Sequence, residues 1–240
     1  MTEFFKLPIF GIGITLIAFF SALALRKKIK FVLFNPVLIA SALIILFLVV
    51  FDVSFTDYNK GGKYWSFFLG PAIVALGVLF FEKYQLIKHN IYPFLLAVGC
   101  GGIVSILSVS FIAVFMNAPD VLIRSMIPIS VTTPIAIEIT KITHGIPSIT
   151  AGVVIAVGIF GNAFGPAFLE ALGIKSKTAM GTALGTAAHG IGTARAIEEG
   201  HLPGAYSGLA MCVNGILTTL IAPYVVIWIV GYVEGNQFII

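Results

Sequence analysis

The chain alternates long apolar blocks with short polar segments. Apolar residues dominate near 7–25, 34–51, 65–82, 91–116, 146–170 and 204–233. A transmembrane helix needs about 20 predominantly apolar residues, and each of these blocks is close to that length. The pattern therefore predicts an all-α polytopic membrane protein.

Two further blocks, 120–144 and 176–199, are long enough to cross a membrane but carry Gly, Pro and polar residues. Lipid offers no hydrogen-bond partners, so irregular backbone at membrane depth has to face protein or a water-filled cavity. We expect these two blocks to be discontinuous or re-entrant. With them, the chain is predicted to have about 6 to 8 transmembrane segments.

Composition supports the membrane assignment. Hydrophobic residues make up 59% of the chain and charged residues only 10%, against about 25% charged residues in soluble domains. The formal charge of +4 is spread over the polar segments, which argues against nucleic-acid binding. No long linker divides the sequence, so residues 1–240 are predicted to form a single integral membrane domain.

Basic residues predict the orientation of the chain in the membrane. Four of them follow the first apolar block: Arg26, Lys27, Lys28 and Lys30. By the positive-inside rule this loop is cytoplasmic and the N-terminus is external. Counting onward, 83–90 is cytoplasmic and 117–120 is external. If both mixed blocks crossed fully, Lys175 and Lys177 would be external, which fits the rule poorly.

The order of Pro and Gly residues suggests an internal repeat. Pro93 precedes a run that contains Gly99, and Pro147 precedes a run that contains Gly158. Interrupted segments at corresponding positions of two halves are typical of transporters with inverted repeats. The halves would lie near 34–116 and 120–233. Chance occurrence of Gly and Pro in membrane helices is the alternative.

A helix start is predicted around Thr132, Thr133 and Pro134. Pro is favoured in the first helical turn, and a Thr just before it can cap free N–H groups. At membrane depth such a start would offer N–H groups and the positive end of the helix dipole to a carboxylate. Glu138, one turn further on, is a candidate proton carrier. The alternative is an ordinary interfacial helix start whose N–H groups are hydrated.

The polar residues of block 176–199 occur at helical spacing. On a continuous helix, one stripe would hold Thr182, Thr186, His189 and Thr193. Polar groups inside a membrane usually mark a route for something hydrophilic. An imidazole titrates near neutral pH, so His189 is a second candidate proton carrier. A His that only bonds a neighbouring helix is the alternative.

Arg195 is the best candidate anion anchor, since a guanidinium is always charged and binds carboxylates through two parallel hydrogen bonds. An ion pair with Glu198 or Glu199 is its alternative. Asn162, a lone amide in an apolar helix, is a candidate to complete the site. An interhelical hydrogen bond is the alternative for Asn162.

Glycines in the same block are assigned two roles. Gly190 follows His189 and is included in the predicted substrate site. Gly185 and Gly192 are, together with Pro134, the predicted breaks in the helices. Gly185 also belongs to a small-xxx-small pattern, whose usual meaning is close helix packing.

Several of these motifs together resemble the LrgB/CidB family of bacterial membrane proteins. They are SVTTPIAIEITKITHGIPSITAGVVI at 130–155, GNAFGP at 161–166, GTALGTAAHGIGTARAIEEG at 181–200 and GAYSGLAMCVNG at 204–215. The resemblance is strongest from 70 to 223. It implies a bacterial cell membrane protein with a small holin-like (LrgA/CidA-type) partner, and we also expect a homo-oligomer.

The resemblance implies one of two functions. Members are regarded as holin/antiholin-type modulators of murein hydrolase activity and cell lysis. Similarity to the plastid glycolate/glycerate transporter implies instead a secondary transporter of small monocarboxylates such as glycolate, glycerate, pyruvate or lactate. Polar, helix-interrupting blocks favour the transporter, because holins typically need only a few oligomerising helices.

The predicted mechanism is alternating access, with His189 and Glu138 as the candidates for proton coupling. The helix start at Thr132 and the segment 182–195 would converge at the midplane, where Arg195 would bind the substrate carboxylate. We expect no enzyme, since the sequence has no HExxH, GxSxG or P-loop motif. No cofactor and no metal site are predicted.

Overall fold

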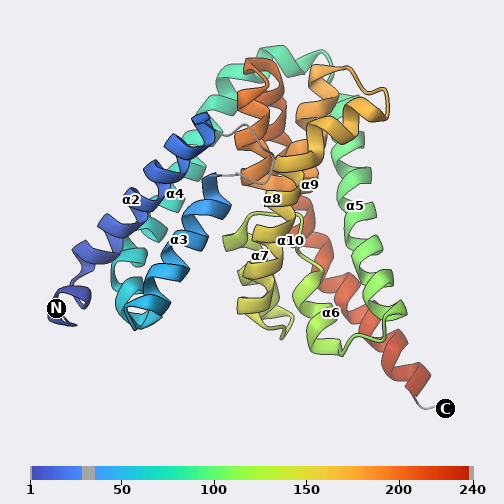
Figure 1. The fold of residues 1–240 in the computed structure, drawn as a ribbon. Coiled ribbons are helices and arrows are strands. Elements are labelled where there is room, and N and C mark those ends of the chain that lie inside the picture. The colour runs from blue at the N-terminus through green and yellow to red at the C-terminus, as the bar shows by residue number, and fades with distance from the viewer. Residues whose placement is uncertain (1, 29–35, 238–240) are drawn as a thin grey trace. The chain divides into compact units, whose positions relative to one another are not determined.

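The computed structural model describes residues 2–28 and 36–237, without several side chains between 66 and 87 and those of 232–237. Lys30 and the start of the predicted 34–51 helix therefore lie outside the described residues. All regular elements of the described part are helices (Figure 1). The chain divides into two compact units, Met1–Phe81 and Glu82–Ile240.

The first unit is organised around its longest apolar helix. It contains α1 (Thr2–Phe5), α2 (Pro8–Lys28), α3 (Pro36–Val50) and most of α4 (Phe55–Lys88). Small buried residues, Ala18, Ala22 and Ala40, bring α2 and α3 together. α2 also approaches α4 closely, because a Cβ at Gly11 would overlap the backbone at Tyr58. Helix α2 thus packs against both other long helices of the unit.

The second unit contains the remaining helices: α5 (Ile91–Phe115), α6 (Asp120–Met126), α7 (Thr133–Ile142), α8 (Pro147–Ala171), α9 (Lys177–Glu198) and α10 (His201–Gln237). Four described helices are long and apolar enough to span a membrane, namely α2, α5, α8 and the His201–Gly231 part of α10, and α3 is a shorter apolar helix. The prediction of an all-α polytopic membrane protein is confirmed.

The first mixed block folds back on itself. Arg124 Nη1 donates to the Thr143 carbonyl oxygen at 3.1 Å, and Ser125 Oγ accepts from the Ile146 N–H at 2.7 Å. The chain has therefore returned to the level of α6 when α7 ends. The turn between the two helices, 127–132, is not helical. We refer to residues 120–142 as hairpin 1, with its tip at 130–132.

The second mixed block also reverses direction, within α9. Lys177 Nζ lies 3.2 Å from Glu199 Oε2, whereas a straight helix of 22 residues would separate its ends by about 33 Å. The reversal occurs at His189, whose backbone angles are φ 41° and ψ −131°. We refer to α9 as hairpin 2, with arms 177–188 and 190–198. Both blocks are discontinuous as predicted, and a full crossing by either is wrong.

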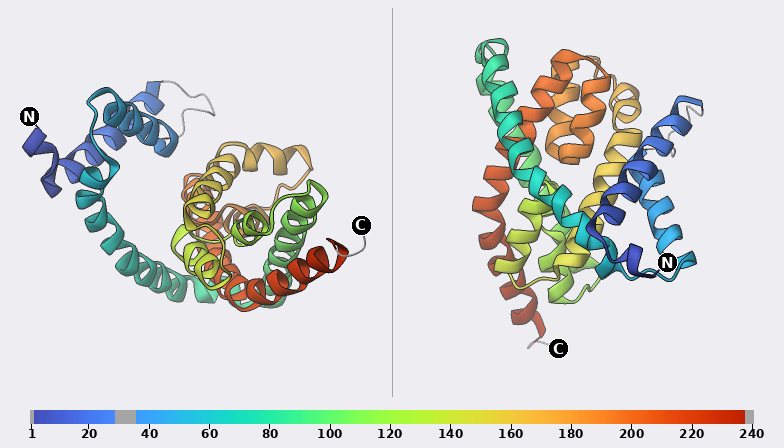
Figure 2. Two further views of the ribbon diagram at one scale, coloured as in Figure 1. Left: turned by 90° about the horizontal axis from the view of Figure 1, so that it is seen from below. Right: turned by 90° about the vertical axis from the view of Figure 1, so that its left-hand side faces the viewer.

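The two hairpins enter the second unit from opposite ends. Hairpin 1 follows α5 and hairpin 2 follows α8, which runs back in the opposite direction, as Figure 1 and the right-hand view of Figure 2 show. Each half of this arrangement is a long helix followed by a hairpin, inverted relative to the other. This matches the similarity seen between the sequences after Pro93 and Pro147. The longer repeat halves, 34–116 and 120–233, stay a prediction.

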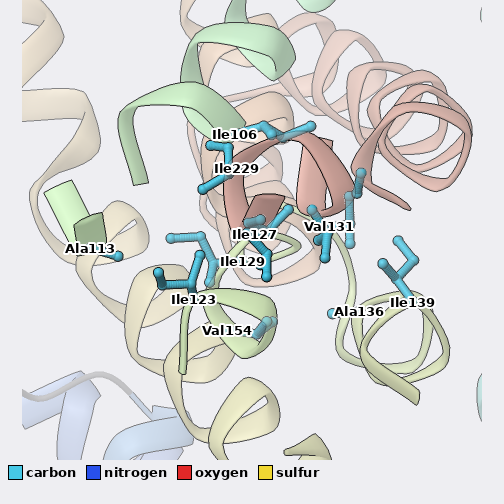
Figure 3. Close-up of a cluster of buried hydrophobic side chains, with 13 residues drawn as sticks. Ile106, Ala113, Ile123, Ile127, Ile129, Val131, Ala136, Ile139, Val154 and Ile229 are labelled. Carbon is cyan, nitrogen blue, oxygen red and sulfur yellow. The ribbon is translucent and has the colours of Figure 1, made fainter. Parts of the chain in front are cut away.

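Hairpin 1 is embedded in the apolar core of this unit. Ile123, Ile127 and Val131 are almost completely buried, and they cluster with residues of α5, α8 and α10, among them Ile106, Val154 and Ile229 (Figure 3). Because α7 and the preceding turn are short, surrounding helices supply most of their burial. This packing fixes where the tip of hairpin 1 lies.

Candidate functional site

The tips of the two hairpins meet at one side chain of α10. Asn214 Nδ2 donates to the carbonyl oxygen of Ser130 in hairpin 1 and to that of Thr186 in hairpin 2, each at 3.0 Å. Ser130 also forms a hydroxyl–hydroxyl hydrogen bond with Ser105 of α5. Asn214 is fully buried, so both tips are anchored inside the unit rather than at its surface.

A cavity of about 570 Å³ reaches this meeting point. It lies between α5, the first arm of hairpin 2 and the start of α10, and its polar lining consists of Asn90, Ser105, Thr178, Thr182, Thr186 and Tyr206. Ser105 and Thr186 link it to the hairpin tips. The lining residues include no Asp, Glu, Lys, Arg or His. The volume is within the usual range for small-molecule sites.

Thr182 and Thr186, two predicted site residues, therefore lie at the cavity. Thr182 Oγ1 donates to the Thr178 carbonyl oxygen at 2.9 Å, and Thr186 Oγ1 donates to the Thr182 carbonyl oxygen at 2.8 Å. Each hydroxyl proton is thus engaged with the carbonyl one turn earlier. For a ligand, these oxygens keep their capacity to accept hydrogen bonds.

The predicted helix start at Pro134 is confirmed, because α7 begins at Thr133 with Pro134 in its first turn. The predicted threonine cap is wrong: Thr132 is the N-cap residue but its side chain forms no cap hydrogen bond. Its backbone is extended at this position, and its Oγ1 is buried without a hydrogen-bond partner. Neither Thr132 nor Thr133 is among the residues that line the cavity.

The predicted stripe through His189 and Thr193 is wrong, because the chain reverses at His189 and Thr193 belongs to the returning arm. His189 is buried, and its Nε2 lies 3.0 Å from the Val154 carbonyl oxygen of α8. Thr193 Oγ1 donates to the His189 carbonyl oxygen and contacts Ser207 Oγ of α10 at 2.9 Å. Gly190 directly follows the reversal. His189 and Thr193 hold the tip of hairpin 2, and His189, Gly190 and Thr193 all lie outside the cavity lining.

The predicted helix breaks at Gly185 and Gly192 are also wrong, since both residues are helical. A Cβ at Gly185 would overlap the backbone of Ser207 in α10, and one at Gly192 would meet the Leu184 carbonyl oxygen in the opposite arm. Both glycines permit close approach of helices. Asn162 Nδ2 donates to the Ile191 carbonyl oxygen at 2.9 Å, which is the interhelical hydrogen bond considered as its alternative.

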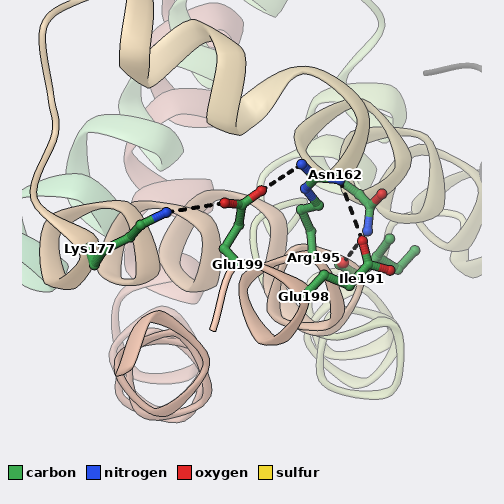
Figure 4. A network of polar contacts seen from close by, with 6 residues as sticks. All are labelled: Asn162, Lys177, Ile191, Arg195, Glu198 and Glu199. Atoms are coloured by element: carbon green, nitrogen blue, oxygen red, sulfur yellow. Dashed lines mark hydrogen bonds and ion pairs between the residues drawn. The ribbon is translucent and has the colours of Figure 1, made fainter. Parts of the chain in front are cut away.

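Arg195 lies in an ion-pair network at the open end of hairpin 2 (Figure 4). Its Nη2 is 2.6 Å from Glu199 Oε1 and its Nη1 is 3.4 Å from Glu198 Oε2. Lys177 reaches the same Glu199 carboxylate. The network closes the base of the hairpin, and Arg195 does not line the cavity.

Glu138, the other predicted proton carrier, is mostly exposed. Its Oε1 lies 2.6 Å from Lys141 Nζ, and 66% of its side chain is accessible. Among the described residues no group of three or more His, Cys, Asp or Glu side chains could hold a metal ion.

Sequence reasoning missed the central role of Asn214 and the contact between Ser105 and Ser130. Asn214 carries a signal that could have been used, because it is an amide in a long apolar helix, as Asn162 is in α8. The two serines had no such signal, since isolated serines in membrane helices often bond only their own backbone.

Comparison with known proteins agrees with the family resemblance that the sequence motifs indicate. The model of the LrgB-like family matches residues 15–228. The chain is 37% identical over 217 residues to the antiholin-like protein LrgB of Bacillus cereus (strain B4264), covering 90% of this chain and 94% of the relative. The protein of the same name from Bacillus anthracis (strain CDC 684 / NRRL 3495) gives the same values.

No solved structure matches the chain significantly. The family model covers most of the sequence, and the matched region includes both hairpins and Asn214. The chain therefore belongs to the LrgB-like family.

Proposed function

We propose that this protein is a secondary carrier of small monocarboxylates that works by alternating access. The observation that carries the proposal is the meeting of two oppositely oriented hairpins at Asn214, at the inner end of a cavity whose lining includes six polar side chains. Interrupted helices whose ends meet inside the membrane are the usual substrate sites of secondary transporters. A cavity that ends where interrupted helices meet suits a small hydrophilic solute.

The charge around the cavity suits an anion. Asn90 precedes α5 and Thr178 lies in the first turn of α9, so two helix N-termini with their positive dipole ends border the cavity. Lys88 lies at the end of α4, whereas the Lys177 ammonium is paired with Glu199. We infer that the substrate carboxylate is attracted by the helix N-termini and by Lys88, and that Arg195 acts on hairpin 2 rather than on the substrate.

If both hairpins are re-entrant, the topology of the chain is consistent with the positive-inside rule. If hairpin 1 enters and leaves on the external side, α8 returns the chain to the cytoplasm, and Lys175 and Lys177 then lie inside, as the positive-inside rule requires. The N-terminus is external in this proposal. The cavity, bordered by Asn90 and Thr178, opens towards the cytoplasm of a bacterial cell.

The second candidate function is modulation of murein hydrolases and lysis, together with a small holin-like membrane protein. The names of the relatives favour this function, since both are called antiholin-like. The cavity and the hairpins support movement of a solute, whereas the names of the relatives support a role in lysis. The two proposals are therefore tested by different measurements.

Reconstitution of the purified chain in liposomes tests the carrier proposal. Labelled lactate, glycolate, glycerate and pyruvate outside the vesicles should accumulate when the same unlabelled acid is trapped inside, because a carrier exchanges them. Vesicles without protein are the control. If no acid exchanges, while expression of the chain alters lysis in cells with a holin-like partner, the second candidate function is supported instead.

A further inference from the structure

We propose that the tip of hairpin 1 and the facing side of α10 form a binding site for a monovalent alkali cation, Na⁺. The ligands are the side-chain oxygens of Thr132, Asn214 and Thr218, together with carbonyl oxygens of the turn 127–131. The inference stands on buried oxygen atoms, and it does not depend on the proposed carrier function.

Three buried side-chain oxygens in this region have no hydrogen-bond partner in the described part of the protein. They are Thr132 Oγ1 at the tip of hairpin 1, and Asn214 Oδ1 and Thr218 Oγ1 on α10. Asn214 is 0% exposed and Thr218 is 1% exposed. Buried polar atoms are nearly always paired in folded proteins. Three such oxygens on two adjoining segments therefore indicate a bound group that interacts with oxygen lone pairs.

The orientation of the Asn214 amide is fixed by its contacts. Its Nδ2 donates to the carbonyl oxygens of Ser130 and Thr186, and carbonyl oxygens only accept hydrogen bonds. Turning the amide round would therefore set Oδ1 against both carbonyls. Oδ1 lies against α5 at Gly102, one turn before Ser105, whose hydroxyl bonds that of Ser130 at the tip of hairpin 1. The protein thus leaves an acceptor beside this tip without a donor.

Thr218 is held against hairpin 1 on the same side of α10. It lies one helical turn after Asn214, and Ala222 lies one turn further on. Ala222 belongs to the apolar cluster that includes Ile127 and Val131 of hairpin 1, the last two of which are labelled in Figure 3. Thr218 therefore lies between two contacts that α10 makes with hairpin 1.

The Thr218 hydroxyl differs from that of its neighbour. Thr219 Oγ1 donates to the Gly215 carbonyl oxygen one turn earlier, at 2.8 Å, as threonines in helices commonly do. Thr218 Oγ1 has no such bond. Its lone pairs and its proton are both uncommitted, so the oxygen can turn towards a ligand.

The turn of hairpin 1 adds backbone oxygens to the group. Residues 127–131 are all buried and none is helical, so a helix does not supply partners for their carbonyl groups. Thr132 ends the turn, and its side chain does not cap α7. Unwound backbone carbonyls of this kind coordinate the coupling cation in transporters with interrupted helices.

The ligand set suits a singly charged ion. Every proposed ligand is a neutral oxygen, whereas Ca²⁺ and Mg²⁺ are usually bound through carboxylates. Helix α7 begins at the same place, and the positive end of its dipole opposes a doubly charged ion more strongly than Na⁺. Hard cations of this size bind oxygens at about 2.3–2.6 Å, so the ligands need not lie within hydrogen-bonding distance of one another.

Binding of radiolabelled Na⁺ to the purified full chain in detergent tests the site directly, with choline replacing Na⁺ at constant ionic strength. We expect saturable binding of about one ion per chain. The thermal midpoint should rise with the Na⁺ concentration and should not rise with choline, because a ligand that binds only the folded state stabilises it.

Substitutions locate the ion. Thr218→Val and Thr132→Val each remove one ligand oxygen at nearly constant volume and should weaken Na⁺ binding about tenfold or more. Thr218→Ser keeps the oxygen and should bind Na⁺ as the unchanged protein does. Thr219→Val is the matched control, since it removes the adjacent hydroxyl, which bonds only its own backbone. This control should leave the Na⁺ affinity unchanged.

Each outcome decides the inference. Absence of saturable Na⁺ binding, or equal stabilisation by choline, overturns it. Thr218→Val and Thr132→Val with the affinity of Thr219→Val would place any bound Na⁺ elsewhere and overturn it too. If an ordered water occupies the site instead, Thr218→Val shifts the thermal midpoint equally in Na⁺ and in choline. Should Thr218→Val fail to fold, Thr132→Val and Na⁺ binding to the unchanged protein still decide. None of these measurements involves carboxylate exchange, so their failure leaves the carrier proposal standing.

Discussion

The side-chain amide of Asn214 donates a hydrogen bond of 3.0 Å to the carbonyl oxygen of Ser130. The same amide reaches the Thr186 carbonyl oxygen, so one residue of α10 ties hairpin 1 to hairpin 2. Asn214 also packs against α5, because a Cβ at Gly102 would overlap Asn214 Oδ1. Four segments of the unit therefore depend on a single carboxamide.

Asn214→Ala should destabilise the protein strongly. The substitution leaves two buried carbonyl oxygens without this donor, and each unsatisfied group costs about 1–3 kcal/mol. Unfolding of the purified protein in detergent measures the loss. As a control, Thr219→Val removes a hydroxyl of the same helix that bonds only its own backbone at Gly215. Similar losses for the two variants would contradict the role of Asn214.

Gly185→Ala should separate hairpin 2 from α10. The added Cβ would overlap the backbone of Ser207, and overpacking of this kind costs about 1–3 kcal/mol. Gly152→Ala in α8 is the matched control, since nothing lies within 4 Å of the position of its Cβ. Thermal unfolding of the two variants should differ clearly. An unchanged midpoint for Gly185→Ala would show that the helices separate at no cost.

Much of the fold could be predicted from the sequence because lipid imposes a simple rule on helix length. The apolar blocks 91–116 and 146–170 agree with α5 and α8 to within about one residue, since both ends are set by polar or Pro residues. Pro134 located the start of α7 for the same local reason. These predictions depend on residues close to one another in the chain.

The errors came from contacts between distant residues. The stripe through Thr193 assumed a continuous helix, but His189 adopts a positive φ that a non-glycine residue rarely does without tertiary support. That support comes from Val154 of α8 and from the ion pair between Lys177 and Glu199. Helical periodicity contains no information on either contact. Arg195 was placed in the substrate site for its charge, although its acidic partners are its immediate neighbours.

Acidification should loosen the base of hairpin 2. Burial raises the pKa of the Glu199 carboxyl, but hydrogen bonds and charges from Lys177 and Arg195 outweigh it and hold the pKa below its usual range. A carboxyl with a lowered pKa stabilises the folded state above its unfolded pKa of about 4.3, and this contribution is lost as the pH falls through the folded value.

The thermal midpoint of the purified protein, measured between pH 7 and pH 3, tests this expectation. Glu199→Gln should lower the midpoint at neutral pH and make its decline in acid shallower. The exposed Glu170 is the control position, and Glu170→Gln should leave the profile as it is. Parallel profiles for Glu199→Gln and the unchanged protein would show that the ion pairs add no stability.

His189 should couple transport to protons if it serves as the carrier's titrating group. Its Nε2 faces the Val154 carbonyl oxygen, an acceptor, so the neutral imidazole donates its proton there. Uptake should then depend on pH across the range in which this imidazole titrates. His189→Gln can keep a hydrogen bond to Val154 but cannot titrate. Exchange of substrate for substrate should survive, whereas accumulation driven by a pH gradient should fail.

The exposed His144 provides the control, since His144→Gln should accumulate substrate normally. If His189→Gln still accumulates substrate against a gradient, His189 is not the proton carrier, and Glu138 is the next residue to replace.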